Sequence, residues 1–167
     1  WSHRKNIGTP LDTGSMLMIA EFDPVHPERL ISEPKCLSRP LYGFENTEHT
    51  INNEGPYAFY YHNKIYLAYS GGDARGYLYA IGMLTANDGD DLCDLSVWEK
   101  AKTPIASFAT IPGEYGPGHN SFFWDRDQNL WIAYHAVTSF EEKIVSSGMR
   151  RVYFEQDKTP RVDVIVE

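Results

Sequence analysis

Cysteine is nearly absent from this 167-residue sequence, which contains only Cys36 and Cys93. Two thiols that lie 57 positions apart provide neither a disulfide framework nor the ligand spacing of a metal site. We therefore expect two free thiols with a structural role. The cysteine content does not indicate a cellular compartment.

Long apolar runs and clusters of basic residues are also missing. No apolar stretch approaches the roughly 20 residues that span a bilayer, so we expect no membrane insertion. The formal net charge is −8 and the sequence pI is about 5.2. Nucleic-acid binding depends on clustered Lys and Arg that neutralise phosphates, which argues against a nucleic-acid partner.

Several common catalytic and targeting motifs are lacking as well. There is no G-x-S-x-G elbow, phosphate-binding loop, H-E-x-x-H or C-x-x-C motif. The stretch "DRDQN" at 125–129 lacks the closing Gly and Glu spacing of a calcium loop and is predicted to be a turn. The first residues, "WSHRKNIGTP", contain no apolar signal-peptide core and no initiator Met, so we expect a processed chain or a fragment.

What is present favours one domain made of β-strands. Apolar residues make up 42% and aromatic residues 14% of the sequence, enough for a sizeable core. The apolar stretches are short, β-branched or aromatic, and bounded by Gly, Pro, Asn and Asp. No stretch keeps a helical period, and "DDLCDLSVWEK" at 90–100 is predicted to form at most one turn before a strand.

The sequence also repeats itself. Residues 55–72, "GPYAFYYHNKIYLAYSGG", align with residues 116–137, "GPGHNSFFWDRDQNLWIAYHAV", and both begin with Gly-Pro. This alignment pairs Tyr69 with Tyr134, 65 positions later. Residues 97–106 and 34–40 resemble closing outer strands of two successive repeats. Four strands in a repeat of roughly 60 residues are typical of a propeller blade.

Three repeats are visible, and the first is cut. We predict the end of a cut blade at 1–50, a full blade at 51–112, and a last blade, or most of one, at 113–167. Because a propeller needs about four to eight blades to close, we expect the C-terminal part of a larger propeller. The alternative is a self-contained β-sandwich built from the same hairpins.

Two polar residues begin the innermost strands of adjacent repeats, Glu54 in "NNEGP" and His119 in "GPGHNSF". The starts of such strands line one mouth of a propeller channel. Burial of Glu54 beside Tyr57 and Phe59 would keep it protonated as an acid, whereas a turn carboxylate that accepts backbone N–H bonds is the alternative. For His119 the alternatives are a channel ligand to a metal or water and a hydrogen-bonded core histidine. His135 is interpreted as structural.

The aromatic residues and a late arginine pair leave further alternatives. Eleven Tyr, four Trp and eight Phe can stack on sugar rings, although alternation in "KIYLAYS" and "LWIAYHA" indicates buried strand faces. Arg150 and Arg151 have two alternative interpretations. One of the two guanidinium groups lies in the channel, or both side chains are solvated.

The order and spacing of "NNEGP", "KIYLAYS", "YGPGHNSF" and "WIAYHA" resemble glycoside hydrolase family 43, over about residues 1–155. "SMLMIAEFDPVHPERL" resembles that family's segment before its acid. The resemblance implies a five-bladed propeller of which this chain supplies roughly the last two and a half blades. It also implies an inverting α-L-arabinofuranosidase or β-xylosidase that acts on plant oligosaccharide or polysaccharide and takes part in xylan degradation.

By this resemblance Glu54 is the general acid, and His119 helps to hold a calcium ion or a water on the propeller axis. Arg150 or Arg151 is the candidate counterpart of an arginine that contacts substrate in many members. The family's general base and the Asp that orients the acid fall upstream of Trp1, and Asp12 and Asp23 stand in the wrong context to replace them. The missing N-terminal blades of the same protein are therefore the expected partner, and the isolated chain is expected to be inactive.

Two rival functions remain at this stage. A non-catalytic carbohydrate-binding or structural β-domain would keep the aromatic surface without using Glu54 as an acid. A five-bladed enzyme acting on fructosides is a second rival, against which the "GPGHNS" segment argues. The sequence leaves the compartment open between extracellular and cytoplasmic, with extracellular favoured.

Overall fold

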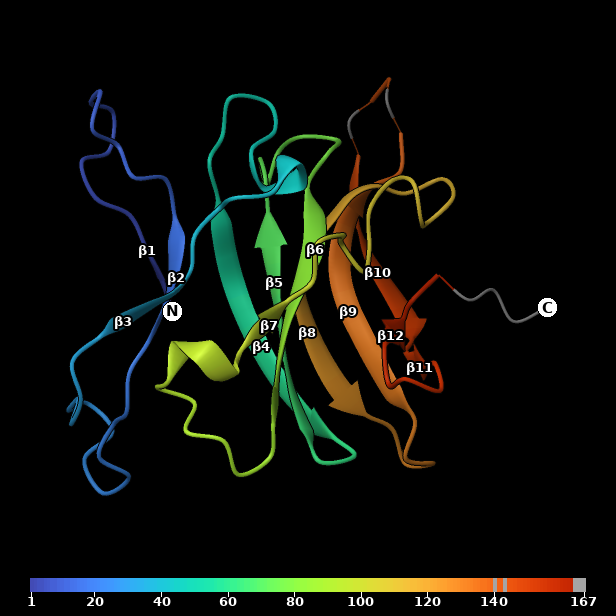
Figure 1. Ribbon diagram of the computed structural model, residues 1–167. Helices are drawn as coiled ribbons and strands as arrows, with labels where there is room; N and C mark the ends of the chain where they lie inside the picture. Colours follow the sequence, from blue (N-terminus) through green and yellow to red (C-terminus); the bar gives the residue numbers. More distant parts are fainter. Residues whose placement is uncertain (140, 143, 164–167) are drawn as a thin grey trace.

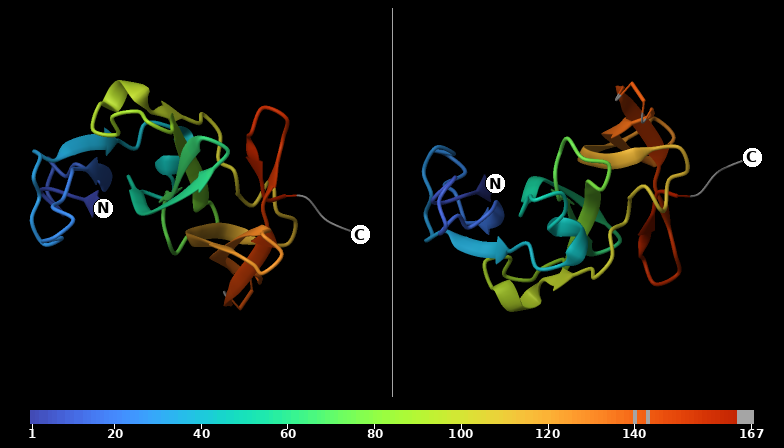
Figure 2. Two further views of the ribbon diagram at one scale, coloured as in Figure 1. Left: turned by 90° about the horizontal axis from the view of Figure 1, so that it is seen from below. Right: turned by 90° about the horizontal axis from the view of Figure 1, so that it is seen from above.

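The computed structural model describes residues 1–139, 141–142 and 144–163. It confirms the prediction of an all-β chain: antiparallel sheets follow one another in chain order, with the N-terminal strands at one side and the C-terminal strands at the other (Figure 1). Viewed along the strands, the sheets lie next to each other from the blue to the red end of the chain (Figure 2). In the described part of the chain, helical structure is limited to the 3-10 turns η1 (Gly43–Glu45) and η2 (Leu95–Val97).

Hydrogen bonding groups the strands into three sheets and a small hairpin. The first sheet contains β1 (Ser2–His3), β2 (Met16–Ile19) and β3 (Lys35–Ser38). The second contains β4 (Asn53–Tyr61), β5 (Lys64–Gly71), β6 (Ala80–Asn87) and β7 (Glu99–Lys100). The third contains β8 (Tyr115–Trp124), β9 (Leu130–Val137) and β10 (Val145–Arg151), and β11 (Tyr153–Phe154) pairs with β12 (Pro160–Arg161).

Local sequence explains the tightest of these connections. His62 and Asn63 join β4 to β5 and both have positive φ, 46° and 61°. Two central residues with positive φ are what a type I′ hairpin requires, and its twist matches that of the flanking strands. The predicted outer strands at 34–40 and 97–106 contain β3 and β7, and the single turn expected within 90–100 is η2.

A tyrosine on the second strand covers a glycine on the third in both complete repeats. Tyr69 lies opposite Gly82, and Tyr134 lies opposite Gly148. A Cβ on Gly82 would come 2.3 Å from the Tyr69 ring, and one on Gly148 would come 2.6 Å from the Tyr134 ring. The pairing of Tyr69 with Tyr134 in the sequence alignment therefore describes one packing arrangement that occurs twice.

The alignment of the inner strands by their Gly-Pro pairs is wrong by three residues. Glu54 lies opposite Ser70 on β5, whereas the residue of β8 opposite His135 is Gly118. A register shift of one residue follows each position. Gly118 therefore corresponds to Glu54, and the two Gly-Pro pairs are not equivalent: residues 55–56 follow Glu54, whereas residues 116–117 precede Gly118.

Two apolar clusters pack the sheets against each other. The smaller one lies between the first and second sheets and is centred on Leu17, Tyr69 and Leu84. The larger one joins the second and third sheets through the buried residues Phe59, Tyr66, Ala68, Ile81, Met83, Ala106, Ile111, Phe122, Leu130, Ile132, Tyr134, Ala136, Val152 and Val162. Burying a large apolar side chain contributes roughly 1.5–3 kcal/mol, so these contacts fix how adjacent sheets sit together.

A fully buried carboxylate, Glu45, anchors the loop between the first two sheets. Its Oε1 lies 2.5 Å from the ammonium of Lys100 and accepts a 2.7 Å hydrogen bond from the Tyr69 hydroxyl. Its Oε2 accepts the backbone N–H groups of Leu41 and Tyr42 at 2.6 and 2.8 Å. Four donors thus compensate the desolvation of this charge, and the loop is held directly before β4.

The two cysteines are unpaired, as expected: Cys36 is partly exposed and Cys93 is buried. Within the described residues there is no helix that is both long and apolar enough to cross a membrane.

Candidate functional site

Glu54 is the second residue of β4 and sits where that strand is distorted. The register shifts between Glu54 and Tyr57, and Gly55 between them has a φ of 56°. A one-residue bulge with glycine in the left-handed region turns the strand and re-aims the neighbouring side chains. The Glu54 side chain is partly buried. It therefore lies neither on the regular face of the sheet nor fully in solvent.

The group that holds Glu54 is Tyr79, which sequence analysis missed. The Tyr79 hydroxyl donates a 2.8 Å hydrogen bond to Glu54 Oε1, and the Tyr79 side chain is fully buried. Burial raises the pKa of Tyr79 well above its usual range, so this phenol keeps its proton. The expected neighbours were Tyr57 and Phe59, but Tyr57 is 40% exposed and Phe59 belongs to the large core.

The pairing of β5 with both of its neighbours brings Tyr79 next to Glu54. Ser70 pairs with Glu54 on one side and with Ile81 on β6 on the other. Tyr79 directly precedes β6, so its side chain starts next to the end of β5 where Glu54 lies. Without the register of β5 against both neighbours, this proximity cannot be read from the sequence.

His119 is the fifth residue of β8, whereas the sequence predicts it at the start of the strand. Its φ is 51°, its side chain is exposed, and its backbone N–H donates a 2.7 Å hydrogen bond to Ser70 Oγ. A Cβ placed on Gly55 would lie 3.6 Å from the imidazole ring of His119. The structure thus brings His119 next to the bulge that carries Glu54.

His135 joins these residues into one cluster. Its ring stacks on Tyr79 with centroids 5.7 Å apart and on His119 with centroids 6.4 Å apart. Burial and the nearby His119 lower the pKa of His135, so the ring is neutral near pH 7. His135 thus contacts both Tyr79, which holds the candidate acid, and His119, in addition to its place in β9.

Gly118 makes room for this arrangement. A Cβ on Gly118 would come 2.0 Å from Cε1 of Tyr79, much closer than any real contact. The backbone of β8 therefore supports the ring whose hydroxyl reaches Glu54. The "GPGHNS" segment contributes a close backbone approach as well as a histidine.

The described residues do not by themselves fit a calcium ion at His119. Calcium takes six to eight oxygen ligands, whereas His119 offers nitrogen. Asn120 is buried and its two side-chain polar atoms lack a partner, whereas the neighbouring His119 side chain is exposed. The one group of three potential metal ligands found in the described residues is Glu21, Asp91 and Cys93, away from His119.

The two arginines lie in different surroundings. Arg150 donates 2.8 Å hydrogen bonds to the hydroxyl of Tyr134 and to Glu114, so much of its guanidinium is already engaged. Arg151 is exposed, bonds to Asn129 and lies over the ring of Tyr153. None of the contacts described for either arginine involves the cluster around Glu54.

Asp12 and Asp23 are held within their own loops. Asp12 forms a bidentate ion pair with Arg4 and accepts the backbone N–H groups of Gly8 and Gly14. Asp23 accepts the backbone N–H of Val25. None of the contacts described for either carboxylate involves Glu54.

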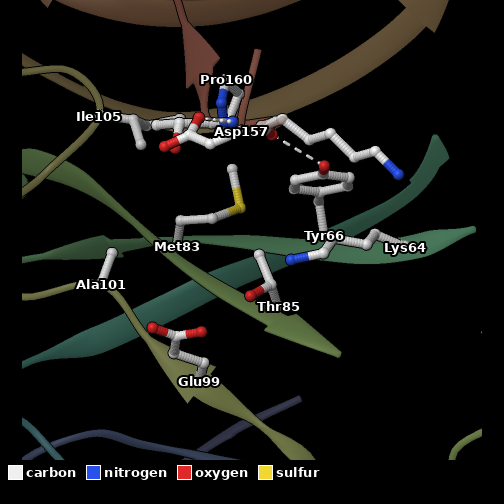
Figure 3. A pocket seen from close by; sticks show the side chains of 11 residues that line it. Lys64, Tyr66, Met83, Thr85, Glu99, Ala101, Ile105, Asp157 and Pro160 are labelled. Carbon is white, nitrogen blue, oxygen red and sulfur yellow. Dashed lines mark hydrogen bonds between the residues drawn. The ribbon is translucent and has the colours of Figure 1, made fainter. Parts of the chain in front are cut away.

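A pocket of about 260 Å³ lies at the other end of the same strands (Figure 3). Lys64 and Tyr66 at the start of β5 line it, together with Asp157 near the C-terminal hairpin. Glu54 lies opposite Ser70 near the end of β5, so this pocket is separate from the candidate site. The Tyr66 hydroxyl donates to the backbone oxygen of Lys158 at its edge (Figure 3).

Successive antiparallel sheets of up to four strands, as found here, are typical of repeated-sheet proteins such as propellers. The sequence profile of glycosyl hydrolases family 43 matches residues 6–160. The chain therefore belongs to glycosyl hydrolases family 43.

Curated relatives match over much of this chain. An extracellular exo-α-(1→5)-L-arabinofuranosidase of Streptomyces avermitilis is 28% identical over 93% of the chain, and the protein of the same name from Streptomyces chartreusis is 34% identical over 75%. The matched regions cover 33% and 37% of those relatives. The chain thus spans about a third of the length of these proteins.

Solved structures show the same fold relationship. The α-L-arabinofuranosidase from Lactobacillus brevis superposes with a TM-score of 0.78 at 29% identity, over 92% of this chain and 49% of that one. A xylan β-1,4-xylosidase from Bacillus halodurans superposes with a TM-score of 0.69 at 14% identity, which shows the fold alone.

Proposed function

We propose that this chain is part of an exo-acting α-L-arabinofuranosidase, in which Glu54 is the general acid. The enzyme would remove terminal arabinofuranosyl groups from plant polysaccharide. The observation that carries this proposal is the Glu54 carboxylate at the start of β4, held by a 2.8 Å hydrogen bond from the buried Tyr79. The similarity to proteins named arabinofuranosidases favours arabinose over xylose.

The chain would supply the last two and a half blades of a five-bladed propeller, with the cut blade at 1–50 and further blades at 51–112 and 113–167. Its coverage of about half of the Lactobacillus brevis structure supports this proposal. The remaining blades would be the chain's structural partner. They would also carry the general base and the carboxylate that orients the acid, since Asp12 and Asp23 are engaged elsewhere.

The reaction would proceed with inversion. Glu54 donates its proton to the glycosidic oxygen as the bond to the anomeric carbon breaks, while a base from the missing blades takes a proton from the attacking water. The two carboxyl groups of an inverting glycosidase stand roughly 6.5–9.5 Å apart to admit that water. His119 would hold a water near the axis, and a calcium ion there would need oxygen ligands from outside this chain.

Two further features follow from the same proposal. The relatives that carry the word extracellular in their names support an extracellular location. Arg150 or Arg151 would contact substrate only if the sugar chain extends beyond the Glu54 cluster, because the contacts described for them lie elsewhere.

The test compares the isolated chain with a protein in which N-terminal blades precede it. We expect the isolated chain to be inactive on α-(1→5)-arabino-oligosaccharides and the longer protein to hydrolyse them. Glu54→Gln in the longer protein should then lower turnover by about 10²–10⁴-fold, the usual contribution of a general acid. Turnover by the isolated chain that Glu54→Ala abolishes would contradict the fragment proposal.

The alternative is a carbohydrate-binding or structural domain without catalysis. It predicts saturable oligosaccharide binding by the isolated chain in calorimetry, with no hydrolysis in either protein and no effect of Glu54→Gln. Hydrolysis that depends on Glu54 in the longer protein excludes it.

A further inference from the structure

Glu54 has one hydrogen-bond donor among the buried side chains of the site. The Tyr79 hydroxyl donates to Glu54 Oε1 at 2.8 Å, and the Tyr79 side chain is fully buried. The fully buried Ser70, which lies opposite Glu54 on β5, accepts a 2.7 Å hydrogen bond from the His119 N–H of β8. The surroundings of the carboxylate are thus held by β5, by Tyr79 and by the backbone of β8.

The direction of the bond between Tyr79 and Glu54 follows from the donors present. An ionised carboxylate only accepts, so the single phenolic proton of Tyr79 is donated to Oε1. Oε1 is therefore already occupied when Glu54 takes up a proton, whereas no hydrogen bond is described for Oε2.

We propose that Tyr79 is a positioning residue for the acid: by occupying Oε1 with its hydroxyl proton, it leaves Oε2 of Glu54 as the oxygen that carries and delivers the catalytic proton. This inference rests on the proposed function of Glu54. A neutral carboxyl group has one O–H and one carbonyl oxygen, and the carbonyl oxygen is the stronger acceptor. While Tyr79 donates to Oε1, the carboxyl proton is therefore placed on Oε2.

The balance of the step is simple. The proton leaves Oε2 for the glycosidic oxygen, which also keeps the electron pair of the breaking bond to the anomeric carbon. The attacking water forms the new bond, and its proton goes to the base carboxylate supplied by the other blades. Oε1 accepts from Tyr79 before and after the transfer, so the acid does not need to turn between turnovers.

Packing holds Tyr79 in the required orientation. Its ring lies on the backbone of Gly118 on β8 and stacks on His135 with an interplanar angle of 12°. Residues that orient a catalytic group act best when packing fixes their own rotamer. The same contacts explain why a buried tyrosine, rather than a flexible polar side chain, faces the acid.

The test uses Tyr79→Phe in the longer protein, with Tyr66→Phe as the matched control. Tyr66 is also a buried tyrosine with one 2.8 Å hydrogen bond, but its partner is the backbone oxygen of Lys158 far from Glu54. Turnover is measured on an arabino-oligosaccharide, whose leaving group needs protonation, and on 2,4-dinitrophenyl α-L-arabinofuranoside, whose leaving group does not.

We expect Tyr79→Phe to lower kcat on the oligosaccharide by about ten-fold or more, a part of the contribution of a general acid, and to change kcat on the dinitrophenyl substrate by less than about three-fold. KM should stay the same, and Tyr66→Phe should affect both substrates equally. An equal loss on both substrates, or no loss, in Tyr79→Phe would overturn the inference.

A second measurement on the 167-residue chain itself does not depend on activity. In proton NMR the Tyr79 hydroxyl should give a slowly exchanging resonance that disappears in Tyr79→Phe and shifts in Glu54→Gln. Rapid exchange, or a resonance that Glu54→Gln leaves unchanged, would contradict the hydrogen bond. If Glu54→Gln in the longer protein keeps full activity, the proposed function fails, while the NMR result still decides whether Tyr79 holds Glu54.

Discussion

His119 occupies in β8 the place that Gly55 occupies in β4. Gly55 follows Glu54, which pairs with β5, and His119 follows Gly118, which pairs with β9. Both lie in a register shift of one residue, and the φ values of His119 and Gly55 are 51° and 56°. Bulges of this kind re-aim side chains and are frequent beside active sites. In β4 the candidate acid Glu54 directly precedes the bulge residue, whereas in β8 the bulge residue itself is His119.

The contact between Gly118 and Tyr79 predicts a strong effect of a single methyl group. Gly118→Ala would place Cβ 2.0 Å from the ring, so the ring or β8 must move. We expect the free energy of unfolding to fall by about 1–3 kcal/mol in chemical denaturation. Gly43→Ala is the control, since a Cβ there meets nothing within 4 Å, and it should change stability by less than about 0.5 kcal/mol. Equal stability of both variants would refute the close contact.

The buried pair of Glu45 and Lys100 predicts a large loss on removal of one charge. Glu45→Gln leaves the ammonium of Lys100 without its counter-ion in a largely buried position, so the free energy of unfolding should fall by about 3–5 kcal/mol. Adding Lys100→Met should recover part of this loss. Glu155→Gln, in an exposed pair with Arg161, should cost less than about 1 kcal/mol. A single variant at Glu45 that costs no more than the one at Glu155 would speak against the buried pair.

Asp125 predicts a pH dependence of stability. Hydrogen bonds from the Trp131 indole and from Asn129 lower the pKa of Asp125 to about 2, below its unfolded value of 3.8. The folded state therefore binds the proton less readily, and the stabilisation is complete above the unfolded pKa and lost as pH falls through the folded one. Asp125→Asn should be less stable than the native chain at pH 7, and the difference should shrink between pH 4 and pH 2. A difference that stays constant over this range in thermal unfolding would contradict the prediction.

We expect Arg150 to contribute more to the stability of the fold than Arg151 does. Arg150→Met removes hydrogen bonds to Glu114 and to Tyr134, so we expect unfolding to become easier by about 1.5–3 kcal/mol. Arg151→Met, at an exposed position, should change stability by less than about 0.5 kcal/mol. In the longer protein, a rise in KM for oligosaccharides with either variant would support a substrate contact, and an unchanged KM would remove it from the proposed site.

The sequence predicted more of the fold than of the site. Short aromatic and β-branched runs between turn residues identified the strands, because side-chain alternation and turn chemistry are local properties. The Gly-Pro pairs misled the alignment of inner strands, since the pair follows Glu54 on β4 but precedes Gly118 on β8. The strand register shows that His119 corresponds to Gly55, which the sequence did not reveal.

By itself, the sequence determined the all-β class and the repeated hairpins, and it singled out Glu54 and His119, which the structure places at the second residue of β4 and the fifth residue of β8. Only the tertiary structure decided what touches Glu54. Tyr79 lies 25 positions away and reaches the carboxylate because β5 pairs with β4 on one side and with β6 on the other. Such a contact depends on the register of three strands and on the positions of their bulges, and no local pattern of residues predicts these.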